Sequence, residues 1–113
     1  MNALSIGLDL NRVLKDLFAG RVYPQFAGLD TPAPFAVYNR DAITRNYDKD
    51  GYDESVQVGL SIVTNSYAEA IELAEKVDDL MHNKLRARMV SAGEAYAIDD
   101  KIYIQELNYS IDT

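Results

Sequence analysis

The chain has 113 residues, with 11 Lys or Arg and 18 Asp or Glu, so its formal net charge at pH 7 is -7. This acidic balance disfavours a protein that binds the phosphate backbone of nucleic acid. The absence of Cys and the presence of one His exclude disulfides, Cys nucleophiles and thiolate or multi-His metal sites. There is no apolar run of membrane-spanning length and no basic flank of a signal peptide, so we expect one soluble, intracellular domain over residues 1–113.

The first predicted element is an amphipathic helix that ends near Gly20. Apolar residues recur at helical spacing along one stripe, formed by Ile6, Leu10, Val13, Leu14, Leu17 and Phe18. Asp9 and Asn11 lie near its start, where side-chain oxygens can accept from free N–H groups, and Gly20 suits a left-handed residue after the helix. Residues 21–34 hold all three prolines and predict a connection that lies against the domain.

A hairpin is predicted next. The segment Phe35–Tyr38 is rich in strand-forming residues, and Val56, Val58, Leu60 and Ile62 alternate with less apolar residues. A two-residue turn at Asp50-Gly51 would place Ile43 opposite Val58, but it would also place Asp41 opposite Leu60 on the core face. Either a bulge near residues 39–42 shifts the register, or the loop is longer.

The second helix is predicted from Ser66, as N-cap of a capping box with Glu69, to about Arg88. A second hairpin then pairs Ala95–Ile98 with Ile102–Ile104 around a polar turn at residues 99–101, and its last strand extends toward Tyr109. The predicted fold class is therefore α+β, in the order α-β-β-α-β-β. A four-stranded, mainly antiparallel sheet with two helices packed on one face would bury every apolar stripe.

Two candidate chemical sites fail on their residue types. Asn46, Asp48, Asp50 and Glu54 follow a calcium-loop spacing, but Gln57 stands where the bidentate Glu is needed. His82 is the single imidazole, and Asp78 four residues earlier indicates a helix-surface pair, not an oriented general base. The sequence also lacks a nucleophile elbow and a phosphate-binding Gly-rich loop. We therefore predict no catalytic residue, no metal ligand and no cofactor, and expect that the chain is not an enzyme.

Aromatic and basic residues indicate contact surfaces. Tyr47 and Tyr52 flank a charged hairpin tip, away from any core, and tyrosine is enriched at protein interfaces. Basic residues gather in two clusters, formed by Arg40, Arg45 and Lys49 and by Lys84, Arg86 and Arg88. The second cluster has an ordinary explanation in the dipole of the helix that it ends. Alternatively, each cluster meets an acidic face on a neighbouring copy.

Four segments occur in a characteristic order. Arg21-Val22-Tyr23-Pro24 follows the first helix, and Pro34-Phe35-Ala36-Val37-Tyr38 precedes a variable polar hairpin. A strand with Gln57-Val58 and a helix opened by Ser66-Tyr67-Ala68-Glu69-Ala70 come next. In this order and spacing, over residues 10–107, the chain resembles the tail completion, or tail terminator, family of tailed bacteriophages and prophages. The charged loop Asp48–Glu54 departs from the family pattern.

The resemblance implies a virion structural protein of the tail, assembled in the bacterial host cytoplasm. Members of the family form a ring, commonly of six copies, that caps the head-proximal end of the tail tube and joins it to the head. The implied partners are further copies of the chain, the tail tube protein and the head connector protein, with no membrane involved. The implied interface residues are Arg21, Tyr23, Pro24, Tyr47, Asp48, Lys49, Asp50 and Tyr52.

A closed ring requires that one patch of each copy docks on a different patch of the next copy. DNA passes through such a ring without specific binding, so we expect acidic residues in the bore and basic clusters between subunits. Three alternatives stay open. They are a head–tail connector adaptor, a small regulatory or ligand-binding α+β domain, and an enzyme, which the missing catalytic motifs disfavour.

Overall fold

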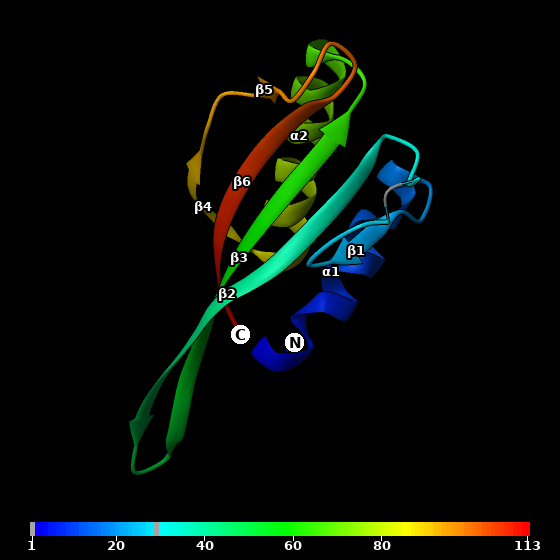
Figure 1. The fold of residues 1–113 in the computed structure, drawn as a ribbon. Helices are drawn as coiled ribbons and strands as arrows, with labels where there is room; N and C mark the ends of the chain where they lie inside the picture. The colour runs from blue at the N-terminus through cyan, green and yellow to red at the C-terminus, as the bar shows by residue number, and fades with distance from the viewer. Residues whose placement is uncertain (1, 29) are drawn as a thin grey trace.

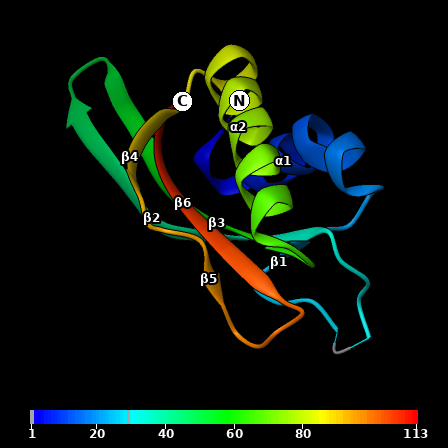
Figure 2. The same ribbon diagram turned by 90° about the horizontal axis from the view of Figure 1, so that it is seen from above.

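The computed structural model describes residues 2–28 and 30–113, and it forms one curved sheet with a layer of helices on one side (Figure 1). Seen from above, both helices lie on the same face of the sheet, as the sequence predicts (Figure 2). The elements are α1 (Ile6–Leu14), β1 (Val22–Pro24), β2 (Phe35–Asp48), β3 (Gly51–Thr64), α2 (Tyr67–Leu85), β4 (Arg88–Ala92), β5 (Tyr96–Ala97) and β6 (Tyr103–Asp112).

The N-terminal helical segment is longer than α1 alone. A 3-10 turn, Ala3–Ser5, precedes α1, and another, Lys15–Phe18, follows it. The N-cap is Asn2, whose side chain accepts from the N–H of Leu4, and not Asp9 or Asn11. The predicted stripe is confirmed, because Ile6, Leu10, Leu14 and Phe18 are fully buried. Two consecutive left-handed residues, Ala19 and the predicted Gly20, end the segment.

Within the described residues, the sheet has six strands instead of the predicted four. Its order is β1-β2-β3-β6-β4, and β5 also pairs with β6. All pairs are antiparallel except β1 with β2, which is parallel. Thus part of the predicted connection is a strand, in which Val22 is buried, whereas Phe26 beyond it is 77% exposed. A three-residue strand leaves no periodic pattern, so its pairing comes from tertiary contact.

The β2–β3 hairpin contains the bulge that the sequence left as one of two alternatives. The register shifts between Arg40 and Ala42, so Asp41 does not enter the core face. The turn itself is one residue earlier than predicted: Asp48 pairs with Gly51 and the turn residues are Lys49 and Asp50. As a result, the partner of Ile43 is Val56 and not Val58.

Helix α2 begins as predicted and ends earlier. The Ser66 hydroxyl accepts from the N–H of Glu69 at 3.1 Å. The helix stops at Leu85 because Arg86 adopts a left-handed conformation with φ of 53°. Arg88, predicted at the end of the helix, instead begins strand β4. The C-terminal hairpin is confirmed, with Tyr96 opposite Ile104, and β6 continues to Asp112.

The core lies between the helices and the inner face of the sheet. The alternating residues of β3, Val56 to Ile62, face buried side chains of α2 such as Val77 and Met81. Burying one such side chain contributes roughly 1.5–3 kcal/mol, so the pairing of these two stripes fixes the layer arrangement.

Candidate functional site

The β2–β3 hairpin projects beyond the rest of the molecule as an arm (Figure 1). The molecule is correspondingly elongated, with principal extents of 55 × 24 × 22 Å. Strand β6 pairs with β3 only as far as Ser55, so residues 45–54, here called the arm, form a two-stranded ribbon. A two-stranded ribbon buries little apolar surface, and its free edges and side chains are available for contact with another protein.

The arm ends in an exposed aromatic pair. The rings of Tyr47 and Tyr52 lie 5.4 Å apart between centroids, and the two residues are 72% and 49% exposed. The guanidinium of Arg45 lies 4.9 Å from the Tyr52 ring centroid, which favours a cation–π contact. The predicted contact residues Asp48, Lys49 and Asp50 are also exposed, at the turn. The structure therefore brings five of the eight predicted interface residues together in one solvated tip.

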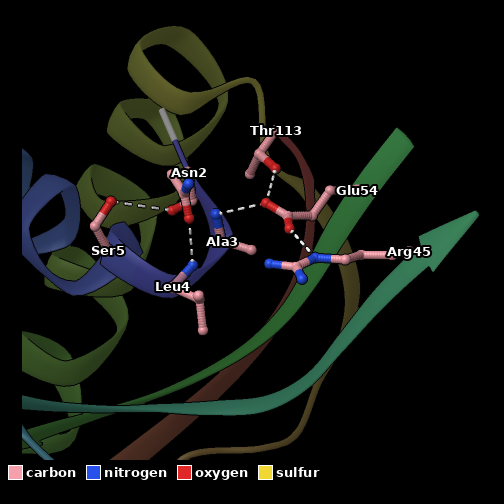
Figure 3. A network of polar contacts seen from close by, with 7 residues as sticks. All are labelled: Asn2, Ala3, Leu4, Ser5, Arg45, Glu54 and Thr113. Carbon is pink, nitrogen blue, oxygen red and sulfur yellow. Dashed lines mark hydrogen bonds and ion pairs between the residues drawn. The ribbon is translucent and has the colours of Figure 1, made fainter. Parts of the chain in front are cut away.

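A buried carboxylate anchors the base of the arm, as Figure 3 shows. Glu54 Oε1 accepts from the Ala3 N–H and from the Thr113 hydroxyl, both at 2.9 Å, and Oε2 accepts from Arg45 Nε. The Ala3 N–H bond, followed by the Arg45 bond, lowers the pKa of Glu54 below its ordinary value. The arm is thus tied to segments near both ends of the chain. Sequence reasoning assigned Glu54 to the charged loop and missed this role.

The other three predicted interface residues lie at the far end of β2. Tyr23 pairs with Val37 in the parallel strand β1, and Pro24 is exposed. Along β2, Val37 lies ten residues before Tyr47, which corresponds to about 33 Å of extended chain. Arg21 also has a structural role, because its Nε donates to the Pro34 carbonyl at 3.2 Å. The two predicted groups therefore form two separate surfaces.

Sequence reasoning missed exposed apolar side chains along the two edges of the sheet. Beside β1, Leu4 and Leu8 are 60% and 77% exposed and line a hollow of about 460 Å³ with Pro24, Tyr38 and Arg40. At the opposite edge, Met89 and Val90 of β4 are 44% and 60% exposed. Isolated leucines and valines carry no signal in a sequence, so only the fold identifies these edges.

The predicted basic clusters are partly used within the chain. Arg40 Nη1 donates to the Leu4 carbonyl at 2.6 Å, and Arg45 binds Glu54. Arg88 lies 3.6 Å from Asp112 in an exposed pair. Such exposed pairs contribute at most about 1 kcal/mol, so they remain exchangeable for contacts with another molecule.

The predicted pairing of Asp78 with His82 is wrong. His82 is exposed, and Asp78 Oδ1 instead accepts from the hydroxyl of buried Tyr109 at 2.9 Å. Burial, and then the Asp78 hydrogen bond, raises the pKa of Tyr109 above its ordinary value. Within residues 2–28 and 30–113, there is no group of three His, Asp or Glu placed to hold a metal ion. No helix of this described part is long and apolar enough to cross a membrane.

A second hollow, of about 550 Å³, lies at the end of the sheet opposite the arm. Its lining is mostly apolar and includes Phe35, Val63, Ile98 and Ile104. A hollow of this size is in the range of small-molecule sites, which also need a few converging polar groups. Here the polar side chains of the lining are those of Thr31 and Asn65.

Comparison with known proteins identifies the fold. No protein-family model matches the chain, and no curated protein matches its sequence. Among solved structures, a chain from the virion of a native gene transfer agent particle matches with a TM-score of 0.62 and 18% sequence identity. The match covers 95% of this chain and 88% of that chain. The two chains therefore share an α+β fold over nearly their whole lengths.

Proposed function

We propose that the protein is a structural component of a bacteriophage or prophage virion. In this proposal it caps the head-proximal end of the tail tube as a homo-oligomeric ring and joins the tail to the head. The observation that carries the proposal is the likeness in fold, over 95% of the chain, to a chain of a virion particle. The sequence resemblance to tail completion proteins supports the more specific role.

The arm supports a role in assembly. An anchored ribbon with two exposed tyrosines at its tip is suited to insertion into a partner, because tyrosine supplies a large contact area with little loss of side-chain freedom. We assign the tip to contact with the tail tube protein or the head connector protein. No chemistry on a substrate is needed for this function.

The residues on the open face of the sheet, the face without helices, support the proposal that this face lines a bore through which DNA passes. Asp41, Glu106 and Asn108 line a small hollow on this face together with Gly59. Carboxylates repel phosphate, so a bore lined by this face would let DNA move without binding. In this arrangement the helices face outward, away from the DNA.

The proposal is tested by deleting the gene in the strain that produces the particle and imaging the products by electron microscopy. We expect tails of uncontrolled length that lack heads, beside DNA-filled heads that lack tails. Unjoined tails of normal length would instead support the connector adaptor. Joined particles of normal length would contradict both roles.

Complementation then tests the arm. A variant with Tyr47→Ser and Tyr52→Ser should fold and remain soluble, because both side chains are exposed, yet fail to restore joined particles. The matched control is Tyr67→Ser, which changes a tyrosine that is 46% exposed at the start of α2, away from the arm. Equal restoration by both variants would contradict the role of the arm tip.

A further inference from the structure

The two edges of the sheet carry exposed apolar surface on opposite sides of the molecule. The strand order β1-β2-β3-β6-β4 places four inter-strand spacings between them, about 19 Å in total. One edge cannot cover the other within a chain. An exposed sheet edge with apolar side chains promotes aggregation unless a partner covers it.

The β1 edge is a concave receptor. Strand β1 ends at Pro24, and Gln25 turns the chain away with a left-handed φ of 66°, so among the described residues β2 has no paired strand on its β1 side beyond Tyr38. Leu4 and Leu8 line the hollow that results, together with Arg40, whose Nη1 donates to the Leu4 carbonyl. This hollow, about 460 Å³ in volume, is lined by both apolar and polar residues.

The β4 edge carries the second group of exposed apolar side chains. All five residues of β4 are exposed, and a register shift between Met89 and Ser91 leaves Val90 out of the ladder. A bulge redirects a side chain, and here Val90 is 60% exposed. The charged residue of β4 itself is Arg88, which lies 3.6 Å from Asp112 of β6.

These two edges match in exposed apolar surface and in strand direction. The exposed Met89 and Val90 of one edge and the exposed Leu4 and Leu8 of the other offer apolar surface to each other. Strand direction agrees as well, since β4 runs antiparallel to β6, β6 to β3 and β3 to β2, so β4 and β2 run in opposite directions. Copies related by rotation about an axis along the strands would thus meet in antiparallel orientation.

We propose that the β4 edge of one copy docks into the β1-edge hollow of the next copy, with Met89 and Val90 against Leu4 and Leu8. This contact specifies how neighbouring copies meet in the proposed ring, and it rests on that proposed function. The contact is heterologous, so every copy uses both edges and a closed ring leaves neither exposed. Bulges on β2 and β4 interrupt a continuous backbone ladder, so side chains carry the contact.

The natural absence of Cys allows a direct test by cross-linking. Leu8→Cys and Val90→Cys are made as single variants and treated with a short bis-maleimide, alone and mixed. We expect cross-linked dimers in the mixture at many times the yield of either variant alone. The double variant should give a ladder that stops at the ring stoichiometry. The matched control mixes Leu8→Cys with Asp79→Cys, an exposed position on α2.

Native mass spectrometry of the wild type separates the two levels of the proposal. A ring without cross-linking above the control overturns the edge contact and leaves the ring standing. Dimers from a single variant alone would also overturn it, because they indicate contact between like edges. A chain that is monomeric both free and on isolated tail ends overturns the ring and the contact together.

A second variant tests the contact without chemistry. Leu8→Asp places a charge in the hollow, and because Leu8 is 77% exposed the thermal unfolding of the monomer should not change. We expect ring dissociation to increase by about tenfold or more, as for truncation of a buried interface anchor. An unchanged ring would contradict the proposal.

Discussion

The substitution Tyr109→Phe removes one oxygen atom from the contact between β6 and α2. Tyr109 is 1% exposed, and its hydroxyl donates to Asp78 Oδ1 at 2.9 Å. The aromatic ring of residue 109 keeps its packing in the Phe variant, so the substitution leaves no cavity of note. The measured change in stability therefore isolates one hydrogen bond between a buried donor and a charged acceptor.

The expected magnitude follows from the two ends of this bond. A hydrogen bond to a charged group contributes roughly 1.5–3 kcal/mol. Asp78 is only half-buried and regains water when the hydroxyl is removed, so we expect a loss of about 1.5 kcal/mol. An unfolding entropy of about 2.1 cal/mol/K per residue over 113 residues then predicts a decrease in Tm of roughly 6 °C.

The pH dependence supplies an independent check. Burial raises the pKa of Tyr109 in the folded state, so its contribution to stability is complete below the tyrosine pKa of the unfolded chain, about 10. Above that pH the unfolded chain loses this proton first, and wild-type stability falls as pH rises. The difference between wild type and Tyr109→Phe should therefore shrink above about pH 10.

Thermal and urea unfolding followed by circular dichroism measure both effects. Tyr47→Phe is the matched control, because its hydroxyl is on a residue that is 72% exposed, and it should change stability by less than about 0.5 kcal/mol. If Tyr109→Phe matched this control at pH 7, the hydrogen bond would have no net value. A difference that stayed constant to pH 11 would contradict the raised pKa.

Three further predictions concern the arm base, a helix cap and the core. Hydrogen bonds lower the folded-state pKa of Glu54, so Glu54→Gln should reduce Tm at pH 7. This deficit should begin to shrink below the ordinary Glu pKa and be lost as pH falls through the lower folded-state pKa, whereas a deficit independent of pH would contradict the lowered pKa. Ser66→Ala removes the acceptor of the Glu69 N–H and should lower the free energy of unfolding in urea by about 1 kcal/mol. An unchanged free energy of unfolding would show that water replaces the cap. Phe18→Ala changes a fully buried residue and should lower the free energy of unfolding by roughly 3–5 kcal/mol. Phe26→Ala changes a residue that is 77% exposed and should lower it by less than about 0.5 kcal/mol. Similar losses in the two variants would contradict the burial of Phe18 in the core.

Local patterns predicted the elements whose side chains alternate between core and water. The stripes of α1, α2 and β3 are visible in the sequence because each element has one buried face. The Ser66 cap is also local, since the acceptor and the N–H that it binds lie three residues apart. The bulge at Asp41 was anticipated as one of two alternatives, since an acidic side chain on the core face is unfavourable.

Edge strands escaped prediction because nothing local distinguishes them. Every residue of β4 is exposed, so it has no alternation, and the left-handed Arg86 that separates it from α2 is not a typical helix terminator. Strand β1 pairs in parallel with a strand that begins eleven residues after it ends. Its position depends on packing that the sequence of these three residues does not encode.

The same distinction applies to the candidate site. The sequence by itself determined that Tyr47 and Tyr52 flank a polar turn, because the turn residues and the flanking strands are adjacent in the chain. Only the tertiary structure decided that this turn is the tip of an arm, and that Glu54 is buried between Ala3, Arg45 and Thr113. A carboxylate becomes buried only where donors from distant segments converge on it, and such convergence depends on the fold as a whole.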